Sequence, residues 1–98
     1  MGFWANQAYA GQAFRYYFKD PRPEPDSDMA RLNLAAAEKA MKKMSVRDRG
    51  LLREVYTSGL FPLHKAVAQV AQETGTAERE IWNAIRHVTR HFARARGL

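Results

Sequence analysis

Residues 67–86 read VAQVAQETGTAEREIWNAIR, and their spacing predicts two helices joined by a tight turn. Ala71 offers only a methyl group where the first helix would press on the second. Gly75 follows four residues later, where the chain must leave the first helix with a positive φ, which costs glycine nothing. Thr76 offers a hydroxyl to cap the next helix, and Ile81 would return the chain to the core. This spacing is typical of a DNA-binding helix-turn-helix, although an ordinary helical hairpin that never contacts DNA has a similar pattern.

The charge of the chain favours a polyanionic partner. The 98 residues, a length that suggests one domain, carry 16 basic and 10 acidic side chains, a net charge of +6. Residues 1–38 hold four basic and five acidic side chains, whereas residues 39–98 hold twelve basic and five acidic ones. The positive excess therefore lies in the half that contains the predicted helix-turn-helix, which suits nucleic acid better than a generally solubilising surface does.

Several classes of protein are disfavoured by what the sequence lacks. Without cysteine there is no disulfide framework or thiolate metal site, which agrees with a cytoplasmic protein. No apolar run is long enough to span a bilayer, and no signal-peptide pattern begins the chain. His87 and His91 have the i, i+4 spacing that can chelate a metal, but no carboxylate or cysteine nearby supplies a third ligand. We therefore expect no cofactor, no metal and no enzymatic activity.

Aromatic residues are concentrated at the start of the chain. Residues 3–18 hold seven of the eleven aromatic side chains, and a helical face is expected from Phe3, Gln7, Ala10, Phe14 and Phe18. Such a face would dock on the protein's own core or form a dimer or partner surface. We expect residues 1–19 to be a helical aromatic segment and residues 20–27, which carry three prolines, to be a stiff linker.

The remaining residues, 28–98, are expected to form the helix-turn-helix domain of an all-α protein with four or five helices. A helix is expected to start after Ser27 or Asp28, and the next begins behind Ser45, a capping serine. Gly59 should end that helix, and Pro62 suits the start of the following one. Helices are thus expected near residues 46–58, 63–74 and 77–95.

The last predicted helix has two distinct faces. A buried stripe is expected from Ile81, Ala84, Ile85, Val88, Phe92 and Ala95. The opposite side carries Arg79, Asn83, Arg86, Arg90 and Arg94. Such a face is commonly just solvated, but a helix of this width fits the major groove, and arginine and asparagine can pair with guanine and adenine edges.

Residues 32–96 resemble region four of bacterial sigma factors. The matching order is AEKAMKKM, then SVRDRGLLREVY, a short link, and AVAQVAQETGTAEREIWNAIRHVTR. Residues 47–49 replace the usual arginine-glutamate-arginine with Arg-Asp-Arg, and the link SGLFPLH is longer and more apolar than usual. The resemblance implies promoter reading by the helix-turn-helix and RNA polymerase contact by the supporting helices. The chain has no room for the other sigma domain, so it looks more like the stand-alone phage and prophage regulators of the ArpU and RinA kinds.

The first functional hypothesis is a sequence-specific transcription regulator that binds double-stranded DNA. Its base-reading residues would be Arg79, Asn83 and Arg86, with Glu78 and Trp82 at the margin. Its phosphate contacts would be Lys65, Thr76, Arg90 and Arg94. Trp82 is also a candidate for packing beneath the N-terminal aromatic residues, which we favour slightly.

Two other hypotheses remain open at this point. One is a phage DNA-packaging component of the small-terminase kind, which would assemble into a ring. The other is a protein-interaction module that contacts RNA polymerase without reading DNA. A homodimer through the aromatic segment is compatible with the regulator, because one helix-turn-helix covers few base pairs.

Overall fold

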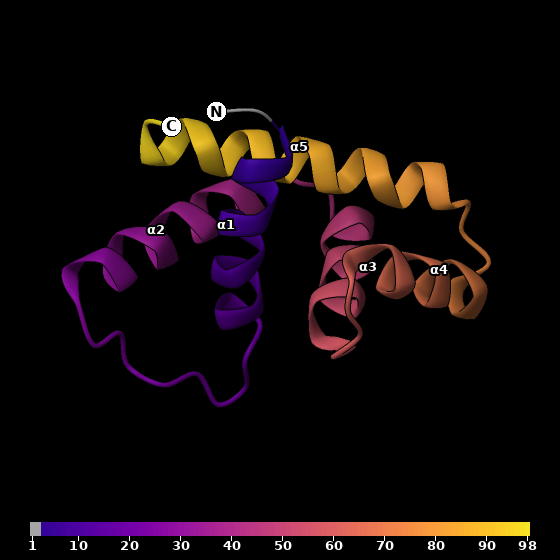
Figure 1. The fold of residues 1–98 in the computed structure, drawn as a ribbon, viewed down its shortest axis with the longest axis horizontal. Helices are drawn as coiled ribbons and strands as arrows, with labels where there is room; N and C mark the ends of the chain where they lie inside the picture. The colour runs from indigo at the N-terminus through magenta and orange to yellow at the C-terminus, as the bar shows by residue number, and fades with distance from the viewer. Residues whose placement is uncertain (1–2) are drawn as a thin grey trace.

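The computed structural model describes residues 3–98, and side chains from residue 6 onward, as five α-helices. Figure 1 shows their arrangement, and no strand occurs among the described residues, which confirms the predicted all-α class. The helices are α1 (Phe3–Tyr17), α2 (Asp28–Lys42), α3 (Val46–Thr57), α4 (Leu63–Thr74) and α5 (Glu78–Arg96). None of these helices, as far as the chain is described, has the length and apolar character needed to cross a membrane.

Helix α5 is the element that all the others contact. It has 19 residues and lies along one side of the molecule in Figure 1. Helices α1 and α2 lie against its C-terminal half, whereas α3 and α4 lie against its N-terminal half. The molecule therefore has two groups of helices that share one long helix.

The aromatic residues of α1 dock on the protein's own core. The ring of Phe14 lies edge-on to Phe92 of α5 at 5.5 Å between centroids and 5.3 Å from the ring of Tyr56 of α3. The ring centroid of Tyr9 lies 6.0 Å from that of Phe92. The side chain of Phe3, which was expected on the same face, lies outside the described side chains. Burial of aromatic surface and edge-on ring contacts both stabilise this arrangement.

Two serine caps begin helices as the sequence predicts. The Ser27 hydroxyl accepts a hydrogen bond from the backbone N–H of Ala30, and the Ser45 hydroxyl accepts one from that of Asp48, both at 3.1 Å. Each bond satisfies a backbone donor that the first helical turn leaves unpaired. Beyond the end of α3, Gly59 adopts a φ of +73°, so the predicted stop is confirmed.

Polar contacts join α1 and α2 to the C-terminal end of α5. Arg96 donates from Nε to the Asn33 side-chain oxygen at 2.8 Å, and the Tyr9 hydroxyl donates to the same oxygen at 3.1 Å. The non-helical connection between α1 and α2 folds back onto these helices, because Arg22 contacts both the Tyr17 ring and Glu38. These contacts tie α1, α2 and the end of α5 together.

Candidate nucleic-acid interface

The turn between α4 and α5 has the predicted backbone geometry. Gly75 caps α4 with φ +68° and ψ 18°, in the left-handed region. Apart from Gly75 itself and its two chain neighbours, no atom lies within 4 Å of the position that a Cβ would take there, so the requirement for glycine is conformational rather than steric. Ala71 is half-buried and packs against the core, and its predicted place between the two helices stays a prediction.

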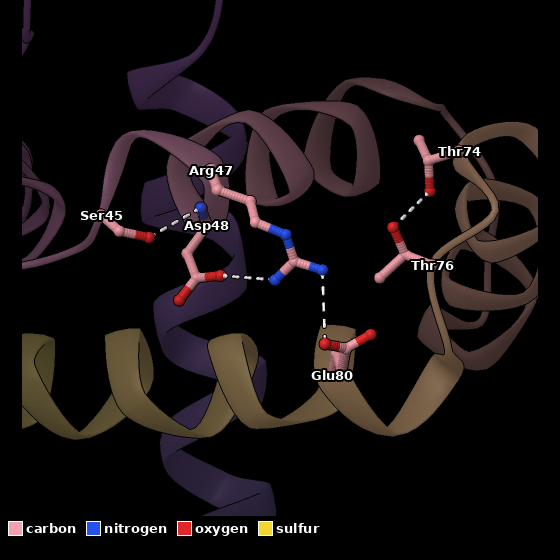
Figure 2. A network of polar contacts seen from close by, with 6 residues as sticks. All are labelled: Ser45, Arg47, Asp48, Thr74, Thr76 and Glu80. Atoms are coloured by element: carbon pink, nitrogen blue, oxygen red, sulfur yellow. Dashed lines mark hydrogen bonds and ion pairs between the residues drawn. The ribbon is translucent and has the colours of Figure 1, made fainter.

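The prediction that Thr76 caps the last helix is wrong. The N-cap of α5 is Ala77, which makes no side-chain cap hydrogen bond. The Thr76 hydroxyl instead lies 3.0 Å from that of Thr74, as Figure 2 shows, while the Thr74 hydroxyl donates to the Val70 carbonyl at 2.7 Å. Thr76 is one residue too early to cap α5, and its hydroxyl belongs to the turn.

An ion pair connects the first turns of α3 and α5. The Arg47 guanidinium lies 3.4 Å from the Glu80 carboxylate and 3.7 Å from that of Asp48, and Figure 2 shows it reaching from α3 toward α5. Glu78 and Glu80 also suit the positive end of the α5 dipole. Because both members of the Arg47–Glu80 pair are largely exposed, the pair contributes only about 0.2–1 kcal/mol to stability.

The buried stripe of α5 matches the prediction except near its end. Ile81, Ala84, Ile85, Val88 and Phe92 are all buried. Ala95 is exposed, so its predicted burial is wrong, and Thr89 and Ala93 are buried instead. Thr89 and Ala93 line a depression that Asn6 of α1 also lines, so this side of α5 lies beside α1.

A row of four arginines and one asparagine, here called the arginine stripe, follows the outer side of α5. It consists of Arg79, Asn83, Arg86, Arg90 and Arg94, all exposed. The spacings of three and four residues keep them on one face over about 22 Å of helix. Among the described side chains, no carboxylate lies within 4.0 Å of these guanidinium groups. Like charges at i, i+4 destabilise a helix by about 0.2–0.5 kcal/mol per pair, so the stripe carries a small cost that an anionic partner would remove.

One hydrogen bond orders the middle of the arginine stripe. Arg86 donates from Nη1 to the Asn83 side-chain oxygen at 3.3 Å. The bond leaves the other guanidinium donors of Arg86 and the amide donors of Asn83 available. Both side chains can therefore present hydrogen-bonding groups toward a partner from neighbouring turns of the helix.

The other predicted site residues are placed in three different ways. Glu78 is exposed in the first turn of α5, beside the start of the arginine stripe. Trp82 is half-buried and packs against the core, and its predicted place beneath the N-terminal aromatic residues stays a prediction. Lys65 is exposed on α4, and Thr76 is half-buried in the turn, so neither belongs to the stripe.

The two histidines on α5 have no third metal-ligating side chain beside them among the described residues. His87 is exposed and His91 is half-buried, and the described residues contain no group of three metal-ligating side chains. Burial lowers the pKa of His91, and the positive charges of Lys43 and Arg94 lower it further. The neutral imidazole is therefore the favoured form of His91 in the folded protein.

Sequence reasoning missed two residues beside the arginine stripe. Asn6 of α1 and Thr89 of α5 line a depression together with Arg86, Arg90 and Arg94. The amphipathic pattern of α5 marks its apolar residues as core and gives no sign that Thr89 is buried. The position of Asn6 follows only from the way α1 packs across α5.

Comparison of the chain with protein-family models, with curated proteins and with solved structures finds no match.

Proposed function

We propose that this chain is a sequence-specific transcription regulator that binds double-stranded DNA and inserts α5 into the major groove. The observation that carries the proposal is the arginine stripe, which stands unneutralised on the second helix of a pair joined through the left-handed Gly75. A helix about 10–12 Å in diameter fits a major groove about 12 Å wide. The resemblance to sigma region four adds support and favours a stand-alone regulator of the kind found in phages and prophages.

The N-terminal half of the stripe would read bases. Arg79 and Arg86 can pair with guanine, and Asn83 can pair with adenine. Glu78, exposed in the same first turns, can accept a hydrogen bond from a cytosine amino group. Trp82 is half-buried, so any contact it makes with a base would use only the exposed part of its side chain.

The C-terminal half of the stripe would hold the DNA backbone. Arg90 and Arg94 are exposed and lack carboxylate partners among the described side chains, which suits phosphate contacts. Lys65 on α4 and Thr76 in the turn are further candidates for the backbone on either side of the groove. A dimer would lengthen the site that is read, but the apolar face of α1 is already buried in the core, so a dimer through α1 would have to use its outer side.

Selection of bound duplexes from a random pool tests the proposal and reveals any half-site symmetry. Binding of the selected duplex and of a scrambled one is then measured by fluorescence anisotropy for Arg86→Ala and Arg94→Ala. Arg86→Ala should weaken binding of the selected duplex by about 1–3 kcal/mol and relax specificity, because a base contact is lost. Arg94→Ala should weaken binding of both duplexes alike and reduce the dependence of the affinity on salt.

Other outcomes favour the alternative functions. Equal losses in both variants on both duplexes contradict the base-reading role of Arg86. Absence of binding to any duplex at low salt supports a protein-interaction module, which would then be tested on RNA polymerase. A large ring in native mass spectrometry supports a packaging component, whereas a monomer or dimer supports the regulator.

A further inference from the structure

A basic depression lies between the start of α1 and the C-terminal half of α5. It has a volume of about 580 Å³, and its walls include Arg86, Arg90 and Arg94 on one side and Asn6 of α1 on the other. Thr89 contributes to the wall from the inner side of α5. No aspartate or glutamate is among the described residues that line it, which also include Ala93 and Leu98, so its side-chain charge comes from the three arginines.

Two polar atoms in the wall of this depression lack hydrogen-bond partners within the described part of the chain. Thr89 is only 2% exposed, and its hydroxyl oxygen is buried and unpartnered. The side-chain oxygen of Asn6 is in the same condition. Buried polar groups are normally paired, so two unpaired groups beside three arginines point to a polar ligand.

We propose that this depression binds a phosphate group. Arg90 and Arg94 would pair with the phosphate oxygens, since guanidinium groups offer forked donors that match them. The Thr89 hydroxyl would donate to a third oxygen after a small movement of the wall, and a half-turn of the Asn6 amide would direct its donors to the same place. Arg86 stays at the rim, because it is hydrogen-bonded to Asn83.

The phosphate can come from the DNA backbone or from a free phosphate ester. The first source rests on the proposed function and makes α1 part of the DNA-binding surface, although α1 lies outside the α4–α5 pair. The second source would place a small anion where it competes with DNA for Arg90 and Arg94. The same side chains serve both sources, so the experiment has two arms.

The first arm titrates the full chain with inorganic phosphate and follows the amide signals of Asn6 and Thr89 by NMR, with chloride as the ionic-strength control. Arg94→Gln should weaken phosphate binding by about tenfold, since a charged hydrogen bond is lost. Arg53→Gln removes the same charge from an exposed position on α3 and should change the affinity less than about twofold. Thr89→Val should weaken binding too, whereas Thr57→Val, on exposed α3 surface, should not.

The second arm measures duplex binding of the same variants by fluorescence anisotropy. The site is assigned to the DNA backbone if inorganic phosphate leaves the amide signals unchanged while Thr89→Val and Arg94→Gln weaken binding of the selected and scrambled duplexes equally. Phosphate binding that Arg94→Gln weakens supports the site even where no duplex binds, and in that case the proposed function fails alone. The site is overturned, and the proposed function stands, if phosphate leaves the amide signals unchanged and both variants bind duplex with wild-type affinity. Both proposals are overturned if phosphate leaves the amide signals unchanged and no duplex binds.

Discussion

The two halves of α5 lie in different surroundings. The C-terminal half packs beside α1 and α2, where the rings of Tyr9 and Phe14 both contact that of Phe92. The N-terminal half packs beside α3 and α4, whose buried side chains are aliphatic except for Tyr56. The half that buries the largest side chains is thus the one farther from the proposed base-reading residues.

This difference indicates a division of roles along a single helix. The aromatic half holds α5 in place, and the aliphatic half presents Arg79, Asn83 and Arg86 beside the turn at Gly75. Tyr56 joins the two halves, because it belongs to α3 and contacts Phe14 of α1. Burial raises the pKa of Tyr56 to about 12, so its phenol stays protonated at any physiological pH.

The largest expected effect compares the two halves directly. Phe92→Ala should lower the free energy of unfolding by about 3–5 kcal/mol, and Ile81→Ala by about 2–5 kcal/mol, because both side chains are fully buried. Urea denaturation followed by circular dichroism measures both. A larger loss of unfolding free energy for Ile81→Ala than for Phe92→Ala would contradict a larger contribution of the aromatic half to stability. Two separate unfolding transitions would show that the halves unfold independently.

The turn between α4 and α5 is expected to matter next. Gly75→Ala should cost about 1–2 kcal/mol, because φ +68° is unfavourable for a residue with a Cβ. Gly50→Ala is the matched control: Gly50 lies inside α3 with no atom within 4 Å of its Cβ position, so alanine should stabilise the protein by about 0.5–1 kcal/mol. Thermal denaturation measures both variants, and a change of the same sign in the free energy of unfolding of each would refute this contrast.

Helix capping gives a smaller effect and separates Ser45 from Thr76. Ser45→Ala removes the bond to the Asp48 N–H and should cost about 1 kcal/mol. Thr76→Ala removes no cap and should change the free energy of unfolding by less than about 0.5 kcal/mol. Chemical denaturation of the two variants side by side tests this, and an equal loss would restore Thr76 as a cap.

The ion pair between α3 and α5 should be weaker still. A double-mutant cycle with Arg47→Ala and Glu80→Ala is expected to give a coupling of about 0.2–1 kcal/mol that decreases as salt is added. A coupling that persists unchanged in high salt would mean that the pair is better shielded from water than its exposure indicates.

The smallest effect is a dependence on pH. The folded protein has a lowered His91 pKa, so the unfolded chain binds more protons below the ordinary value of 6.5. The free energy of unfolding should therefore fall as the pH drops below about 6.5, and His91→Gln should reduce this slope. Denaturation at a series of pH values measures the slope, and an unchanged slope in the variant would exclude His91 as its source.

Local features of the sequence predict the helix bounds, the serine caps and the left-handed Gly75 well, because each depends on a few neighbouring residues. The exposure of the arginine stripe follows from helical periodicity alone. The predicted cap of α5 is wrong because the N-cap is Ala77, one residue after Thr76, whose hydroxyl lies beside that of Thr74. The residue at which α5 begins depends on the path of the turn, which the sequence pattern does not specify.

The end of α5 and the basic depression could not be predicted in the same way. The position of Thr89 beside Asn6 depends on where α1 crosses α5, and α1 is joined to α2 by a non-helical segment that leaves this crossing undetermined by the sequence. Asn6 enters the wall of the depression only through that crossing. Contacts between residues more than eighty positions apart are beyond the reach of periodicity and motif spacing.

Because α5 is continuous, the protein should tolerate an inserted residue less well within this helix than in the segment between α1 and α2. One inserted residue near His87 would rotate everything beyond it by about 100° and advance it by about 1.5 Å. The ring of Phe92 would then leave its pocket, and the outer guanidinium groups would turn out of line with those before them. Added residues between α1 and α2 would disturb neither, so natural length variation should collect there and avoid the shared helix.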